Sequence, residues 1–208
     1  MQTPDQIRQL LAAKIPQQAV PYCESLWHTW PFSLKLAGSR TSKAGDFTVR
    51  NNRLCISVNR NLNPYLFLFT LIHEIAHAVV YRQYGRKVSP HGREWKNTFS
   101  GLMAPLLVTK YFPQDLLGHL QRHLQNPAAS SSFDLALTRC FRKYDLHPDG
   151  FMLLADLPQQ ALFRLQQRWF IKGPLRRSRY ACQCVRTQRI YLVPGQALVS
   201  VAQLPLFA

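Results

Sequence analysis

One stretch of the chain, from Asn63 to Gly85, constrains the fold more than any other. Asn63 followed by Pro64 is typical of a helix start, because Asn caps free backbone amides and Pro fits the first helical position. The apolar pattern then continues to Tyr84 and ends at Gly85. Since the stretch is apolar on nearly every side, we predict one long helix at the centre of a core.

Other helices are predicted on both sides of this stretch, with short strands before it. Apolar spacing predicts helices over Gln6–Lys14, Gln17–Trp27, Gly92–Met103 and Asp115–Leu124. Alternation of apolar and polar residues predicts strands over Phe32–Leu36, Asp46–Arg50 and Arg53–Val58. Asn51 and Asn52 tolerate the left-handed backbone of a tight hairpin, so we expect the last two of these strands to pair.

The C-terminal part of the chain has a different composition. Residues 126–132 read Asn-Pro-Ala-Ala-Ser-Ser-Ser, which is typical of a linker. After Asp156 there is no acidic residue, and the sequence alternates as short strands do over Phe163–Leu165, Trp169–Ile171, Arg179–Cys182, Ile190–Val193 and Ala197–Val201. We therefore predict an α+β protein with a main domain over 1–125, a connecting segment over 126–156 and a basic β-rich appendage over 157–208.

The charge balance is unusual. The chain has 26 Lys and Arg residues against 10 Asp and Glu residues, a net charge of +16, and its sequence pI is near 10.2. Such a field attracts polyanions, of which nucleic acid is the commonest in a cell, so we expect DNA as a partner. The alternative is a basic surface that only faces solvent. Hydrophobic residues make up 47% of the chain, which excludes general disorder.

The sequence also favours an intracellular location. The N-terminal residues lack the continuous apolar stretch of a signal peptide. The most apolar run, Leu66–Val80, is interrupted by ionisable residues and is too short to cross a bilayer, so no membrane partner is expected. The five cysteines are odd in number and lack a disulfide framework, which suits a reducing compartment. We expect a cytoplasmic protein, with association with the nucleoid as an option.

The long helix carries the motif His-Glu-x-x-His at His73, Glu74 and His77. Positions i and i+4 share one helix face, so both imidazoles can bind one zinc ion (Zn²⁺) while Glu74 reaches a metal-bound water. Zinc lowers the pKa of that water, and Glu74 as general base takes its proton during attack on a carbonyl. The alternative is two core histidines beside a buried Glu74, which would be costly without a metal.

A catalytic zinc needs a third protein ligand and an open fourth position. The sequence leaves several downstream candidates: His91, Glu94, Asp115, His119 and His123. His91 is preferred because it lies in a loop after the helix-ending Gly85, from which the chain can turn back towards the metal. His119 and His123 are spaced as i and i+4 on an amphipathic pattern, which favours an ordinary surface helix.

These residues resemble a known family. Asn59, the His-Glu-x-x-His-Ala run and the later Pro-His-Gly-x-Glu-Trp-Lys run over 90–96 are similar to the SprT-like zinc metalloprotease domain, which is shared with the eukaryotic Spartan proteases that degrade proteins crosslinked to DNA. The resemblance covers roughly residues 5–125. It implies that His91 is the third ligand. It also implies a zincin-like fold of helices packed on a small antiparallel sheet, with Arg53–Val58 near the active site.

The resemblance says little about the tail. Many bacterial relatives end in a zinc ribbon with two cysteine pairs, whereas this chain has only Cys182 and Cys184, so we expect one catalytic zinc and no second, structural one. Cations and aromatic residues interleave here as they do in single-strand binders. The tentative nucleic-acid-binding residues are Arg164, Arg168, Trp169, Lys172, Arg176, Arg177, Arg179 and Tyr180. A β appendage that packs its aromatic residues internally is the equal alternative.

Together these features predict a zinc metallopeptidase that acts on DNA-associated or DNA-crosslinked proteins, with Glu74 as general base. One alternative is a nucleic-acid-binding protein whose zinc site is not catalytic. The retained Glu74 disfavours it, because a structural site needs a fourth ligand and no base. Another is a metallohydrolase of a different amide substrate, which the basic surface makes less attractive.

Overall fold

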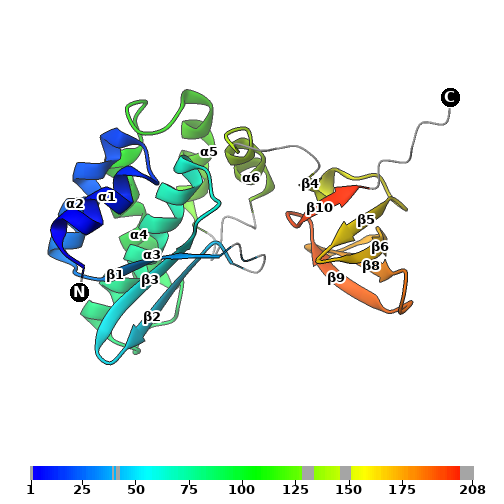
Figure 1. Ribbon diagram of the computed structural model, residues 1–208, viewed down its shortest axis with the longest axis horizontal. Helices are drawn as coiled ribbons and strands as arrows, with labels where there is room; N and C mark the ends of the chain where they lie inside the picture. The colour runs from blue at the N-terminus through cyan, green and yellow to red at the C-terminus, as the bar shows by residue number, and fades with distance from the viewer. Residues whose placement is uncertain (1, 39, 41–42, 128–133, 146–150, 202–208) are drawn as a thin grey trace. The chain divides into compact units, whose positions relative to one another are not determined.

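The computed structural model describes residues 2–38, 40, 43–127, 134–145 and 151–201. By its internal contacts the chain divides into two compact units, Met1–Leu146 and His147–Ala208. In the described residues, the first unit combines helices with a three-stranded sheet and the second is built on a seven-stranded sheet (Figure 1). This combination is consistent with the predicted α+β class.

Helix α3, Pro64–Tyr84, forms the centre of the first unit. Its N-terminus is capped by Asn63, whose side-chain oxygen accepts a hydrogen bond from the backbone amide of Leu66 at 3.0 Å. It ends at Gly85, where φ is 64°, a left-handed backbone that favours glycine. The helix predicted from the sequence is therefore confirmed, including both ends.

The burial of α3 explains its apolar composition. The whole helix has 21 residues, more than the Leu66–Val80 run, and by length and composition alone it could cross a bilayer. However, 67% of its most apolar window is buried inside the protein, as is usual for the central helix of a globular core. The helix packs against α4 and against the strands of the first sheet.

The remaining predicted helices of this unit are also confirmed. They are α1 (Pro4–Ala12), α2 (Val20–Thr29, after a 3-10 turn over Gln17–Ala19), α4 (Arg93–Met103) and α5 (Gln114–Gln125). Their apolar faces join α3 in one core that includes the fully buried Trp95 and Phe99 of α4. A short 3-10 helix, Ala104–Leu106, follows α4.

The first sheet contains β1 (Ser33–Ala37), β2 (Gly45–Arg50) and β3 (Arg53–Asn59) in the order β1-β3-β2. The predicted β2–β3 hairpin is confirmed: the strands pair antiparallel, and the turn residues Asn51 and Asn52 have φ of 47° and 58°. However, β1 pairs with β3 in parallel, so the sheet is mixed and the expectation of an antiparallel sheet is wrong.

A crossover after β1 accounts for this difference. The chain leaves β1, passes the end of β3 and reaches the far edge of the sheet before the hairpin begins. The buried Asn59 holds the crossover: its amide donates to the carbonyls of Arg40 at 2.9 Å and Lys43 at 3.0 Å, and its oxygen accepts from Arg40 Nε at 2.7 Å. These contacts join residues far apart in the sequence, which strand alternation does not reveal.

The first unit extends beyond residue 125. Helix α6, Leu135–Arg142, lies within residues 126–156, where a linker and connecting segment is expected from the sequence, and it packs on α5. Its buried residues Leu137, Cys140 and Phe141 belong to the main core. Thus the amphipathic turns after residue 134 extend this unit. The boundary between the two units in the sequence falls between residues 146 and 147. Much of the Asn126–Ser132 run, and His147, lie outside the described residues.

The second unit is a β-sheet structure around its own small core. Its strands are β4 (Met152–Leu153), β5 (Leu162–Leu165), β6 (Arg168–Ile171), β7 (Leu175–Arg176), β8 (Arg179–Cys184), β9 (Ile190–Pro194) and β10 (Leu198–Val201). The order is β4-β10-β5-β6-β8-β7, with β9 also paired to β8. The five predicted strands are confirmed, whereas β4 and β7 are too short for alternation to be seen. A 3-10 helix, Leu154–Asp156, follows β4.

The cap of α3 generates a stability prediction. Besides capping, the Asn63 amide donates to the Phe141 carbonyl at 2.9 Å and to Asp145 Oδ1 at 2.8 Å, so one side chain joins the start of α3 to the end of α6. We expect Asn63→Ala to lower the free energy of unfolding by about 2 kcal/mol or more, because a cap and a buried hydrogen bond are lost together. Urea titration followed by helical circular dichroism measures this.

Thr3→Ala is the matched control. Thr3 caps the exposed start of α1 and makes no comparable link to another helix, so its loss should cost only about 1 kcal/mol. Equal destabilisation by the two substitutions would contradict the linking role of Asn63.

Candidate metal centre

Helix α3 places the first two histidines of the site. His73 and His77 lie one turn apart on the same face, with their ring centroids 5.1 Å apart. Both rings contact Trp95 of α4. The helical spacing therefore brings two imidazoles to one side of the core.

A sharp turn brings His91 to the same place. After α3 ends at Gly85, the chain reverses, and the backbone amide of Gly92 donates to the Ser89 carbonyl at 2.9 Å. Within this turn His91 has φ of 60°, a left-handed backbone that is uncommon for a residue with a side chain. A Cβ at Gly92 would lie 3.0 Å from the Ser89 oxygen, so glycine suits this turn. The turn directs the His91 ring back towards α3.

The three rings meet through their Nε2 atoms. His77 Nε2 and His91 Nε2 are 2.9 Å apart, and His91 Nε2 and His73 Nε2 are 3.3 Å apart. All three ligand atoms lie within 4.8 Å of one another. In a tetrahedral zinc site with Zn–N bonds of about 2.0–2.1 Å, ligand nitrogens are about 3.3 Å apart. The group therefore fits one metal ion, and among the described residues no fourth side chain joins it.

Trp95 forms the wall behind all three rings. Its ring centroid lies 4.6 Å from His73, 5.3 Å from His77 and 4.6 Å from His91, and the ring also stacks on Phe99. Trp95 is fully buried, and its Nε1 has no hydrogen-bond partner among the described residues. The indole thus restricts the orientation of each imidazole.

Phe47 of β2 covers the site from the other side. Its ring lies nearly parallel to that of His77, at 11° and 6.4 Å between centroids, and it also contacts Tyr81. Trp95 appeared in the sequence only as part of a motif, and Phe47 was not singled out. No local sequence signal identifies Phe47, since its role depends on where β2 lies against α3.

Burial keeps the histidines neutral. It lowers the pKa of His73 to about 2, with the neighbouring His77 and His91 adding to the effect. It also lowers the pKa of His77 to about 4, and it lowers the pKa of His91. At neutral pH each imidazole therefore keeps a lone pair for a metal, and no proton has to leave these rings when one binds.

Glu74 lies beneath the start of β2. A Cβ built on Gly45 would be 2.5 Å from Glu74 Oε1 and 2.7 Å from Thr70 Cγ2, so only glycine allows this approach. Burial, with a smaller contribution from Asp46, raises the pKa of Glu74 to about 8, and the cations of the crossover oppose this rise. In the metal-free protein Glu74 is therefore largely protonated at neutral pH. No sequence pattern indicates that Gly45 shapes this site.

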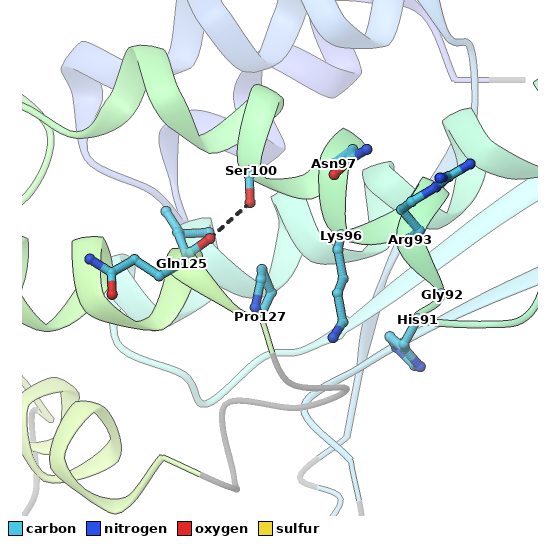
Figure 2. Close-up of a pocket in the computed structure, with 9 residues that line it drawn as sticks. His91, Gly92, Arg93, Lys96, Asn97, Ser100, Gln125 and Pro127 are labelled. Atoms are coloured by element: carbon cyan, nitrogen blue, oxygen red, sulfur yellow. Dashed lines mark hydrogen bonds between the residues drawn. The ribbon is translucent and has the colours of Figure 1, made fainter.

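A hollow of about 360 Å³ opens beside His91 (Figure 2). It is lined by His91, Gly92, Arg93, Lys96, Asn97, Ser100, Leu124, Gln125 and Pro127. Lys96 Nζ donates to Asn126 Oδ1 at 2.7 Å, and Ser100 Oγ donates to the Leu124 carbonyl at 3.2 Å. The lining contains cations, amides and a hydroxyl but no carboxylate. The surface of the hollow next to the third histidine is therefore polar and positively charged.

The other candidate ligands from the sequence lie elsewhere in the structure. Asp115 accepts a hydrogen bond from Lys143 at 3.2 Å, and Glu94 lies 3.9 Å from Arg93. His119 is on α5 and does not join the metal group. The surface interpretation is wrong for His123, which is buried against Phe69 and lies 3.5 Å from Asp134. Its partner Asp134 caps α6, a helix that the sequence analysis did not predict.

The nucleic-acid-binding residues expected in the tail separate into two kinds. Arg164, Arg168, Trp169, Arg176, Arg177 and Arg179 are exposed. Lys172 is buried instead: its ammonium donates to the carbonyls of Ala155 at 3.2 Å and Leu157 at 2.5 Å, and lies 4.1 Å from the ring centroid of Tyr180. Lys172 and Tyr180 thus stabilise the second unit, and the inclusion of Lys172 in an exposed surface is wrong.

The candidate metal centre lies in a part of the chain that matches the model of a known protein family. The model of the SprT-like family matches residues 24–112, a span that contains β1, β2, β3, α3 and the three histidines. The match is shorter than the resemblance expected over roughly 5–125. No curated protein and no solved structure matches the chain. Residues 24–112, which carry the whole candidate metal centre, are therefore similar to the SprT-like family.

Proposed function

We propose that this protein is a zinc-dependent metallopeptidase that acts on DNA-associated or DNA-crosslinked proteins. The observation that carries the proposal is the convergence of the Nε2 atoms of His73 and His77, from α3, and His91, from the turn that follows it. Glu74 follows His73 in the same helix and is buried. The match to the SprT-like family over the same residues supports it.

The donor set favours zinc. Three neutral imidazoles suit Zn²⁺ and leave one position of a tetrahedral site for water or substrate. A zinc ion bound here would supply Lewis-acid chemistry, polarising a carbonyl and lowering the pKa of water. Trp95 packs on all three rings and Phe47 packs on His77, so these contacts restrict the orientation of the ligands.

Glu74 is the group that moves protons. It follows His73 in the helix, and as a carboxylate it would accept a proton from the attacking water and pass it to the leaving amine. Its raised pKa matches a general base that works near neutral pH, once a nearby cation has favoured its ionised form. Because Gly45 has no side chain, it leaves space for the Glu74 carboxylate.

Charge supports a substrate bound to nucleic acid. The chain carries a net charge of +16. Around the turn that carries His91, the exposed cations are Arg82, Arg86, Lys87 and Arg93. Phosphates attract such side chains, so a protein held on DNA would be brought towards the metal centre.

Glu74→Gln tests the enzymatic proposal. We expect this variant to keep its fold and zinc content but to lose at least about 100-fold in peptide hydrolysis, because an amide cannot accept the water's proton. The assay follows cleavage of an unfolded basic protein with and without DNA, alongside metal analysis. Glu24→Gln is the matched control, since Glu24 lies in a surface pair with Arg8 at 3.2 Å.

Two results would contradict the proposal. Equal cleavage by wild type and Glu74→Gln would remove Glu74 from the mechanism. A zinc-loaded wild type that cleaves no protein, with or without DNA, would favour a non-catalytic zinc site in a nucleic-acid-binding protein.

Proton release on zinc binding tests the electrostatics of the site. At pH 7 the imidazoles are already neutral, whereas Glu74, with a pKa of about 8, is mostly protonated and must ionise beside the cation. Wild type should therefore release about one proton more than Glu74→Gln. Above the pKa of Glu74 the difference should disappear, because the carboxylate is ionised before zinc binds.

Calorimetric titration with zinc in buffers of different protonation enthalpy measures this difference. Equal proton release by the two proteins at pH 7 would mean that Glu74 is not the protonated group.

A further inference from the structure

The strand register of the second unit separates an inner from an outer face of its sheet. Phe163 pairs with Phe170, and both are buried in the core of the unit. The next pair along the same two strands, Arg164 and Trp169, therefore points to the opposite face. Trp169 is 39% exposed, so a tryptophan lies on the outer face directly across from an arginine.

Large apolar side chains continue across this outer face. The next rung joins Leu162, Ile171, Gln183 and Ile190 across four strands, and Leu192 lies beside it on β9. Leu162 is 41% exposed, Ile190 61% and Leu192 53%. Apolar residues grouped in this way on a sheet face are typical of a binding surface.

A hollow of about 460 Å³ adjoins Trp169 at one end of this face. It lies between the β5–β6 turn and the end of β8, where the Val185 amide donates to the Trp169 carbonyl at 2.9 Å. The residues that line it are Gln166, Gln167, Arg168, Trp169, Val185 and Arg186. It offers an aromatic ring, two cations and two amides, with no acidic group.

After Asp156 the charged side chains of the second unit are all positive. Residues 157–208 contain eight Lys and Arg residues and no acid, and of the eight only Lys172 is buried. Two exposed groups of three arginines can be compared. Arg164, Arg168 and Arg186 lie near Trp169, whereas Arg176, Arg177 and Arg179 lie at the β7–β8 hairpin, about 20 Å away along β8.

We propose that the outer face around Trp169 is a binding site for single-stranded nucleic acid. An exposed aromatic ring can stack on an unpaired base, and arginines beside it can contact the adjoining phosphates. A duplex keeps its bases stacked internally and would not use the ring in this way. This inference does not depend on peptidase activity.

Two triple variants of the full-length protein test the location. Both remove three positive charges: R164A/R168A/R186A near Trp169, and R176A/R177A/R179A at the hairpin. Binding of a fluorescein-labelled oligothymidylate is followed by anisotropy over a range of salt concentrations. The first variant should lose at least about 10-fold in affinity and about two units of salt slope, since each single-strand phosphate contact contributes about 0.7. The second should lose less than about 3-fold.

Trp169 variants test stacking separately. Trp169→Ala should weaken binding by about 5- to 150-fold, the range expected for one stacked base, whereas Trp169→Phe should stay within about 3-fold of wild type. The oligonucleotide should quench tryptophan emission in wild type and not in Trp169→Phe. That second readout distinguishes a ring in contact with bases from one that only supports the fold.

Several results would overturn the proposal. Equal losses in the two triple variants would mean that only the general positive field attracts the oligonucleotide. Unchanged affinity in Trp169→Ala would remove the stacking site, and so would tighter binding of duplex than of single strand. Competition by polyglutamate as effective as that by unlabelled oligothymidylate would identify a general polyanion or acidic-protein surface.

Discussion

The packing of α3 inside the first unit is the constraint on which the rest of the structure depends. A helix that is apolar on nearly all sides has to be surrounded, and α4 and the first sheet supply that surrounding. The same burial acts on His73, Glu74 and His77, which lie in the middle of the helix. Burial favours the neutral form of each of these groups. The burial that stabilises the fold through apolar side chains therefore also keeps the imidazoles uncharged, so that they can bind a cation.

Ligand orientation then depends on two aromatic residues and one turn. Trp95 contacts all three imidazoles, Phe47 covers His77, and the left-handed backbone at His91 returns the chain to α3. None of these groups has to move for the three Nε2 atoms to be neighbours. Packing in the hydrophobic core therefore contributes to positioning the side chains that would hold a metal.

Local signals in the sequence predicted the central helix and the two histidines it carries. Features that depend on residues distant in the sequence were missed. The cap at Asn63, the end at Gly85 and the i, i+4 histidines are all readable within one helix. In contrast, the parallel pairing of β1 depends on a crossover held by Asn59. The room left by Gly45, the burial of His123 and the internal hydrogen bonds of Lys172 likewise depend on partners distant in the sequence. Periodicity carries no information about such partners.

The proposed chemistry requires one zinc ion bound by three imidazoles in a site that keeps an open position. Zinc X-ray absorption spectroscopy on the metal-loaded, full-length protein tests this arrangement, because Zn–N distances of about 2.0–2.1 Å and Zn–S distances of about 2.3 Å are readily distinguished. We expect three imidazole nitrogens and one further light ligand, with no sulfur. A sulfur shell would instead place the zinc on the chain's cysteines and rule out the three-histidine site.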